Sequence, residues 1–150
     1  AFDMKVLSYD PYKKINDTWC IQKDNMKEVV SNCDILAICV HLNDETKGFI
    51  NEEVFSWLKP DSYFINSSRG DTIDESALLK NLVSGKIKAA GLDVISDEDK
   101  ILKDFSHPLI EYAKKNSNLY ITPHIAGLTF DSEYKAQIHS INSIIKFLNS

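Results

Sequence analysis

The chain has 150 residues, 43% of them hydrophobic, which is enough for one domain with a core of its own. Its formal net charge of -5 is spread over both halves without a basic stripe, and this argues against a nucleic acid partner. No apolar run is long enough to cross a bilayer and no signal-peptide pattern is present, so we expect a cytoplasmic protein without a membrane partner.

Strands and helices are expected to alternate along the chain. Strands are predicted at residues 4–9, 18–21, 35–42, 63–65, 89–94 and 119–122. Helices are predicted at residues 25–32, 51–58, 75–84, 107–115 and 131–148. The strand at 35–42 is apolar on both faces, and the charged stretch 96–105 is expected to be a loop. This alternation predicts an α/β fold with a Rossmann-like, doubly wound parallel sheet.

A polar turn follows the strand at 63–65, and it contains the most informative residues of the chain. The turn breaks at Gly70, and Asp74 is expected to cap the next helix. Small side chains there let a ligand approach the backbone, and Arg69 supplies a planar cation suited to a carboxylate. A lone surface arginine more often pairs with a nearby acid. Arg69 is therefore a candidate binding residue only because other candidate site residues are expected beside it.

Polar residues also follow other predicted strands: Asp10, Asp93 with Glu98 beyond it, and His124. Because parallel strands end at one edge of a sheet, these groups are expected to share that edge with Arg69. His124 is the candidate general acid/base, and Glu98 could fix its tautomer.

Asp10 could accept the ribose hydroxyls of NAD, and its charge disfavours the phosphate of NADP. Taken singly, these residues have simpler explanations as turn, capping or solvated residues. Their convergence at matching strand ends favours one shared site.

The three cysteines, Cys20, Cys33 and Cys39, lack the spacing of a metal site, so no metal is expected. Two of them lie in or beside apolar segments. Free thiols in a reducing compartment are therefore predicted.

Six segments, residues 5–11, 42–48, 64–74, 90–94, 107–109 and 121–127, carry a family resemblance in the family's own order. On these segments the chain resembles the nucleotide-binding domain of the D-isomer-specific 2-hydroxyacid dehydrogenases. The resemblance implies an NAD-dependent oxidoreductase that passes a hydride between NAD and the CH–OH group of a small D-2-hydroxy acid. It also implies a homodimer for the intact protein.

The resemblance implies the same catalytic residues. Arg69 would bind the substrate, Glu98 would pair with the histidine, and His124 would donate and accept the proton. It further implies that the residues near the cofactor are Asp10, Val40, Ser67, Ser68, Arg69, Asp93, His124 and Gly127.

The chain departs from the family pattern at two places. Cys39 and His41 stand where the family has a histidine and a proline. After Asp93 the family's usual Glu-Pro pair is replaced. Glu98 is therefore assigned as the acid by counting residues from Asp93, and Asp97 is the alternative.

No glycine-rich phosphate loop occurs in the sequence, although the family places one before the strand at 4–9. We therefore expect an incomplete nucleotide-binding domain over residues 1–150, without its first strand, phosphate loop and first helix. Removing a central strand leaves buried backbone groups unpaired at about 1–3 kcal/mol each. That cost would leave the isolated chain inactive, and helix 131–148 is expected to cross to a separate substrate domain.

Two other functions remain open from the sequence. The first is a non-catalytic, NAD-sensing regulator of the corepressor type on the same fold. The second is a different Rossmann enzyme such as a methyltransferase, in which His124 would have no assigned role. Retention of an arginine, an acid and a histidine favours the dehydrogenase.

Overall fold

The computed structural model describes residues 3–100 and 106–149. Strands and helices alternate along the chain, as the sequence predicts. In chain order the elements are β1 (Val6–Ser8), β2 (Cys20–Gln22), α1 (Met26–Asn32), β3 (Ile35–Ile38), α2 (Glu52–Trp57), β4 (Ser62–Asn66), a 3-10 turn (Gly70–Thr72), α3 (Glu75–Val83), β5 (Ile87–Leu92), α5 (Pro108–Ala113), β6 (Leu119–Ile121) and α6 (Phe130–Leu148).

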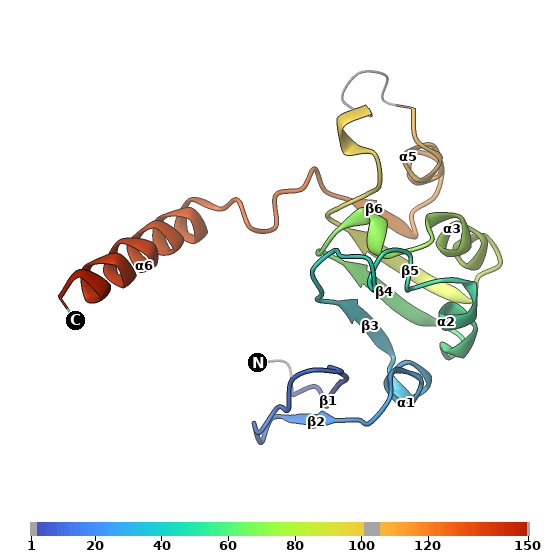
Figure 1. Cartoon of the computed structure of the whole chain (residues 1–150). Coiled ribbons are helices and arrows are strands. Elements are labelled where there is room, and N and C mark those ends of the chain that lie inside the picture. The colour runs from blue at the N-terminus through green and yellow to red at the C-terminus, as the bar shows by residue number, and fades with distance from the viewer. Residues whose placement is uncertain (1–2, 101–105, 150) are drawn as a thin grey trace.

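The strands form two separate parallel sheets (Figure 1). One contains β1 and β2, and the other has the order β3-β4-β5-β6. Within the described residues, β1 and β3 are not hydrogen-bonded to each other, so each keeps one edge without a partner strand. The parallel strands and the helices between them form an α/β, Rossmann-like fold, as predicted.

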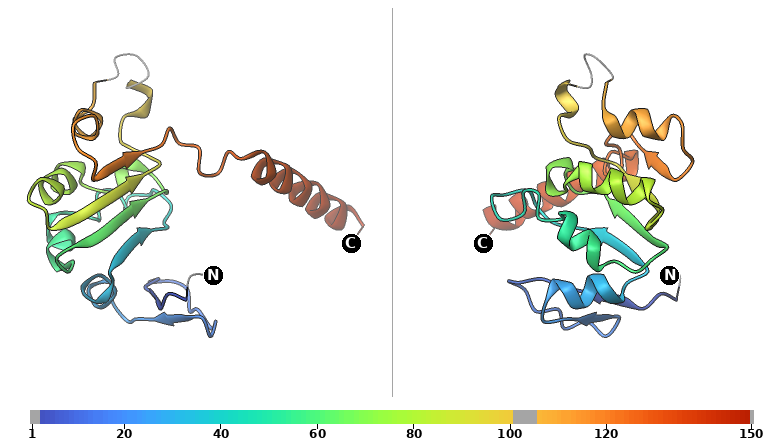
Figure 2. Two further views of the ribbon diagram at one scale, coloured as in Figure 1. Left: turned by 180° about the vertical axis from the view of Figure 1, so that it is seen from behind. Right: turned by 90° about the vertical axis from the view of Figure 1, so that its right-hand side faces the viewer.

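The core lies on one face of the four-stranded sheet, where the helices pack. Phe55 of α2 meets Phe64 of β4 edge to face, with ring centroids 5.3 Å apart, and both side chains are fully buried. Leu78 of α3 and Leu109 of α5 complete this layer. Figure 2 shows these helices together on one side of the sheet.

The opposite face of the sheet carries exposed apolar side chains. Ile35, Tyr63 and Ile65 are 42%, 40% and 43% exposed. The prediction that strand 35–42 is buried on both faces is therefore wrong for the described residues, because the helices packed on this sheet lie on its other face.

Two predicted boundaries also differ from the structure. The strand predicted at 35–42 ends at Ile38, where its pairing with β4 stops. The chain then turns at Asn43, whose side-chain oxygen accepts the N–H groups of Glu45 and Thr46 at 2.9 Å. The stretch 96–105 was expected to be a loop, but residues 98–100 are helical, and residues 101–105 lie outside the described part of the chain.

Side-chain caps begin most of the helices. Asp74 accepts the N–H of Ala77 at 3.0 Å and so caps α3, which confirms the predicted cap. Helix α5 begins one residue later than expected, because His107 is its N-cap rather than its first residue.

Helix α6 has no buried residue and extends away from both sheets at the end of an extended segment (Figures 1 and 2). Its exposed apolar side chains include Ile138, Ile141, Ile144, Ile145 and Leu148. Of the helices in the described ranges, none combines the length and the hydropathy that a bilayer crossing requires.

Candidate active site

The carboxyl ends of β4, β5 and β6 surround a cavity of about 1050 Å³. Most of the residues predicted for the site line it. They are Ser67, Arg69, Asp93, Glu98, His124 and Gly127. Arg69 and His124 therefore lie at the same edge of the sheet, because parallel strands bring their ends together.

A hydrogen bond joins the predicted acid to the predicted general base. His124 Nδ1 lies 2.8 Å from Glu98 Oε2, and both side chains are partly exposed. Glu98 Oε1 accepts the N–H of Ile95 at 3.2 Å, which holds the carboxylate in place. Asp97, the alternative acid, faces Lys100 instead, with 2.8 Å between Asp97 Oδ1 and Lys100 Nζ.

His124 has a backbone conformation that non-glycine residues rarely adopt, with φ of 55°. Its N–H donates to the carbonyl oxygen of Thr122 at 2.9 Å. Such strained positions persist only where surrounding contacts enforce them, and they cluster at functional sites.

Asp93 enforces this conformation by binding the backbone that follows the histidine in the chain. Its carboxylate accepts the N–H of Ile125 at 3.0 Å and that of Ala126 at 2.9 Å, and the hydroxyl of Thr122 donates to it as well. Burial alone raises the pKa of Asp93. These hydrogen bonds and the nearby imidazole of His124 outweigh burial, so the pKa lies below its ordinary value of 3.8.

Arg69 is presented by a turn that Asn66 holds together. Asn66 is fully buried, and its amide donates to the carbonyl oxygen of Arg69 at 2.9 Å while its oxygen accepts from Ser68. The hydroxyl of Thr72 also donates to the Arg69 carbonyl, at 2.6 Å. The Arg69 side chain is exposed, and one of its guanidinium nitrogens donates to the carbonyl oxygen of Ser68 at 2.5 Å. It forms no ion pair with any described residue, so no acid neutralises its charge.

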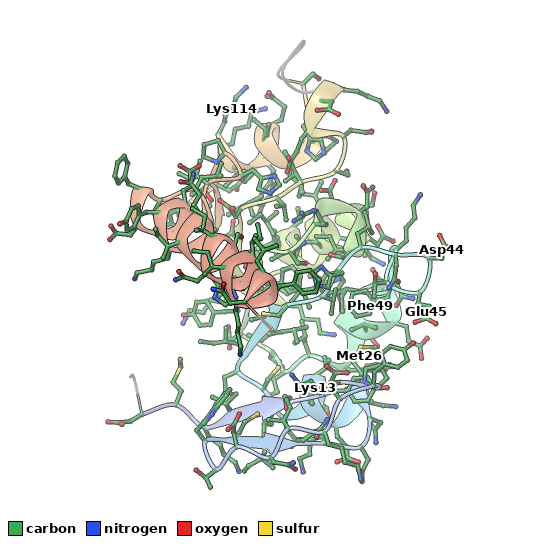
Figure 3. The ribbon with its side chains drawn as sticks, turned by 60° about the vertical axis from the view of Figure 1, so that its left-hand side comes forward. Lys13, Met26, Asp44, Glu45, Phe49 and Lys114 are labelled. Atoms are coloured by element: carbon green, nitrogen blue, oxygen red, sulfur yellow. The ribbon has the colours of Figure 1, made fainter. Side chains whose placement is uncertain are left out.

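Three predicted cofactor residues lie outside this cavity. Ser68 is buried against Asn66, and Val40 is partly buried against the core. Asp10 borders a second, smaller cavity of about 410 Å³ beside β1 and β2. Lys13 borders the small cavity and Lys114 borders the large one, and Figure 3 shows these two residues on different parts of the molecule.

Asp10 is held by its own turn. Its Oδ1 accepts the N–H groups of Tyr12 and Lys13, each at 2.9 Å, and these bonds lower the pKa of the carboxyl. The hydroxyl of Tyr12 donates to Glu45, which joins the turn after β1 to the loop after β3.

Sequence reasoning missed the structural roles of Asn66 and Asp93. A buried asparagine at a strand end, followed by small polar residues, is a usable signal for a fixed turn. Nothing in the sequence shows that Asp93 holds residues 122–126, because those contacts span about thirty residues. Cys39 and His41, the two departures from the family pattern, are exposed after β3. No cluster of metal-binding side chains is found among the described residues.

A family model for the NAD binding domain of D-isomer specific 2-hydroxyacid dehydrogenases matches residues 1–126. A hydroxypyruvate reductase of Thermotoga maritima is 33% identical over 151 residues, which cover 99% of the chain and 46% of that protein. A D-2-hydroxyacid dehydrogenase (NAD+) of Lacticaseibacillus paracasei is 29% identical, again over 99% of the chain and 46% of the relative. The chain thus spans about half the length of these curated relatives.

Solved structures agree with this relationship. The D-lactate dehydrogenase of Aquifex aeolicus, in complex with NAD and lactic acid, superposes with a TM-score of 0.78 at 31% identity. The match covers 97% of the chain and 46% of that structure. A D-2-hydroxyisocaproate dehydrogenase gives a TM-score of 0.84 at 28% identity, over 96% of the chain and 46% of the structure.

Proposed function

Because the chain belongs to the D-isomer specific 2-hydroxyacid dehydrogenases, as their NAD binding domain, we propose that its protein is an NAD-dependent oxidoreductase of D-2-hydroxy acids. The reaction interconverts a small 2-hydroxy acid and the corresponding 2-keto acid at the CH–OH group. One observation carries the proposal: Arg69 and the hydrogen-bonded pair of Glu98 and His124 border the same cavity.

The residues present fit a dinucleotide that runs along the carboxyl edge of the strands. Asp10 uses only Oδ1 for its own turn, so Oδ2 is available for ribose hydroxyls. The other cofactor contacts in this proposal are Val40, Ser67, Ser68, Arg69, Asp93, His124 and Gly127. When bound, the nicotinamide supplies or accepts the hydride.

Arg69 binds the substrate carboxylate in this mechanism. Its planar guanidinium can donate two parallel hydrogen bonds to a carboxylate, and no described acid neutralises it. The turn built on Asn66 fixes where that charge lies.

His124 transfers the proton at the hydroxyl oxygen of the substrate. Glu98 holds Nδ1, which leaves Nε2 free to exchange a proton with the substrate oxygen. Asp93 keeps the histidine in place by binding the backbone beside it.

The same proposal describes residues 1–150 as part of an NAD-binding domain. The unpaired edges of β1 and β3 suit a strand inserted between them. The apolar stripe of α6 suits a helix that crosses to a substrate domain, because an exposed stripe of this kind requires a packing partner. The free state of Cys20, Cys33 and Cys39 supports a cytoplasmic protein, and we include a homodimer in the proposal.

The test uses the full-length protein, with NADH and pyruvate, hydroxypyruvate or 3-phosphohydroxypyruvate as substrates. We expect turnover with at least one of them. His124→Asn should lower kcat by about 10²–10⁴-fold while NADH affinity, followed by fluorescence, changes little. Asparagine is suitable because it tolerates positive φ, and His139→Asn on the exposed helix α6 is the matched control.

Two results would count against the proposal. NADH binding without turnover of any 2-keto acid would favour the corepressor-type regulator instead. Equal losses of turnover and NADH affinity in His124→Asn would mean that this histidine is structural.

A further inference from the structure

A second carboxylate and a second histidine lie beside the segment that leads from β5 to Glu98, with the histidine buried and the carboxylate partly buried. Glu75 is the first residue of α3 and His107 is the N-cap of α5, and their side chains are only 14% and 10% exposed. Glu75 Oε2 lies 3.1 Å from His107 Nε2. A buried carboxylate is costly unless donors satisfy it, so its partners matter.

Ser96 supplies the other two donors. Its N–H donates to Glu75 Oε1 at 2.7 Å, and its hydroxyl donates to Oε2 at 2.5 Å. Ser96 belongs to the segment that follows β5 and leads to Glu98. The carboxylate therefore fixes the position of the backbone that carries the candidate catalytic acid.

His107 is oriented by its capping role. Its Nδ1 accepts the N–H of Leu109 at 3.3 Å, so the ring proton belongs on Nε2, where it points to Glu75. The first turns of α3 and α5 are thus joined through one carboxylate to the segment between β5 and Glu98.

Gly70 packs against the same segment from the arginine side. A Cβ at Gly70 would lie 2.0 Å from the carbonyl carbon of Ile95 and 2.3 Å from the nitrogen of Ser96. The peptide between Ile95 and Ser96 therefore lies between the turn that presents Arg69 and the Glu75 carboxylate.

Further hydrogen bonds connect this segment to the cavity. The N–H of Ile95 donates to Glu98 Oε1 at 3.2 Å, and Glu98 Oε2 meets His124 Nδ1 at 2.8 Å. Two hydrogen-bonded groups, Ser96 and Ile95, thus separate the buried carboxylate from the exposed one.

We propose that Glu75, held by Ser96 and His107, is a positioning residue that sets Glu98 against His124. This inference rests on the proposed function, because it assumes that Glu98 supports catalysis through His124. Glu75 touches neither substrate nor cofactor in this assignment. Its effect on turnover passes through the backbone at Ile95 and Ser96.

A double-mutant cycle in the full-length protein tests this, with Glu75→Gln and Glu98→Gln made singly and together. Glu75→Gln removes the charge and replaces one acceptor oxygen with a donor that faces His107. We expect kcat to fall about tenfold, roughly the effect of losing one hydrogen bond, with NADH affinity within about twofold. In the Glu98→Gln background the same substitution should change kcat less than about twofold.

The matched control is Glu52→Gln, because Glu52 also stands at the start of a helix but pairs with Lys80 in solvent. It should leave kcat unchanged. If Glu75→Gln prevents folding, Ser96→Ala replaces it in the cycle. Ser96→Ala removes the hydroxyl donor alone, and it should lower kcat about threefold in the native background only.

An equal loss in both backgrounds would overturn the inference, because Glu75 would then act independently of Glu98. Unchanged kcat in Glu75→Gln with reduced thermal stability would also overturn it, leaving a purely structural role. If Glu98→Gln itself leaves kcat unchanged, the proposed role of Glu98 fails, and that result is distinguishable from both others.

Discussion

At the scale of single residues, the site depends on carboxylates that hold backbone in place. Asp93 and Glu75 each accept hydrogen bonds from main-chain N–H groups, at Ile125 and Ala126 and at Ser96. Neither needs to contact a substrate to affect the reaction. In the mechanism proposed above, they fix the backbone beside His124 and Glu98, whose side chains are partly exposed.

Asp93 gives a pH prediction whose sign follows from its lowered pKa. Its contribution to folding is fully present above the ordinary value of 3.8 and is lost as the pH falls through the lower pKa of the folded state. Asp93→Asn should therefore reduce the free energy of unfolding by about 1–3 kcal/mol at pH 7, and this difference should shrink below pH 3.8.

Urea unfolding at several pH values measures this effect. Asp44→Asn, in the exposed loop after β3, is the control and should change stability by less than about 0.5 kcal/mol. A difference for Asp93→Asn that stays constant down to pH 3 or below would contradict the assignment.

The sequence was sufficient to predict the polar residues that line the cavity at the strand ends, but not what holds them there. Arg69, Asp93 and His124 follow strand ends, and parallel strands place such residues at one edge. The role of Glu75 was not predictable, because its partners His107 and Ser96 lie more than twenty residues along the chain.

At the scale of elements, two loops approach each other so closely that their backbones leave no room for a side chain. The 3-10 turn at Gly70 meets the segment after β5 so closely that no side chain fits between them. The predicted turn was confirmed, but this contact was not foreseeable from the sequence, since it requires the register of β4 against β5.

Gly70→Ala tests that contact. The added methyl group would lie 2.0 Å from the carbonyl carbon of Ile95, so one of the two loops must shift. We expect a loss of about 1–3 kcal/mol in stability, as for other overpacked sites, together with a lower kcat. Chemical denaturation and steady-state kinetics of the full-length protein measure both.

Gly91→Ala is the control, because a Cβ at Gly91 of β5 meets no atom within 4 Å. It should behave like the native protein. Similar stability and turnover for the two alanine variants would show that the loops are not tightly packed in solution.

Element boundaries were predicted well where a cap or a breaker marks them. Asp74 begins α3 as expected, and Asn51 caps α2. The end of β3 was misjudged, because Cys39 and Val40 continue the apolar pattern after pairing with β4 has stopped at Ile38.

At the scale of the whole molecule, the strands form two sheets instead of one continuous doubly wound sheet. They share no strand pairing among the described residues, and the turn after β1 reaches the larger sheet's loops through the contact of Tyr12 with Glu45. The fold class was predictable from the alternation of elements. The uncovered sheet face was not, because apolar strands look the same whether or not a helix covers them.

The isolated chain should therefore bind NADH weakly or not at all. The Asp10 cavity and the large cavity belong to different sheets, and binding must hold both sheets in register at a cost in free energy. Fluorescence titration of the 150-residue chain should show no saturation at micromolar NADH, whereas the full-length protein should saturate. Micromolar affinity in the isolated chain would disprove this expectation.

Asp93 also separates the histidine from helix α6. Its carboxylate grips the main chain at Ile125 and Ala126, between His124 and the helix. These two hydrogen bonds stand between His124 and α6 along the chain. If α6 packs against a separate substrate domain as proposed, its position there is therefore uncoupled from the contact of His124 with Glu98.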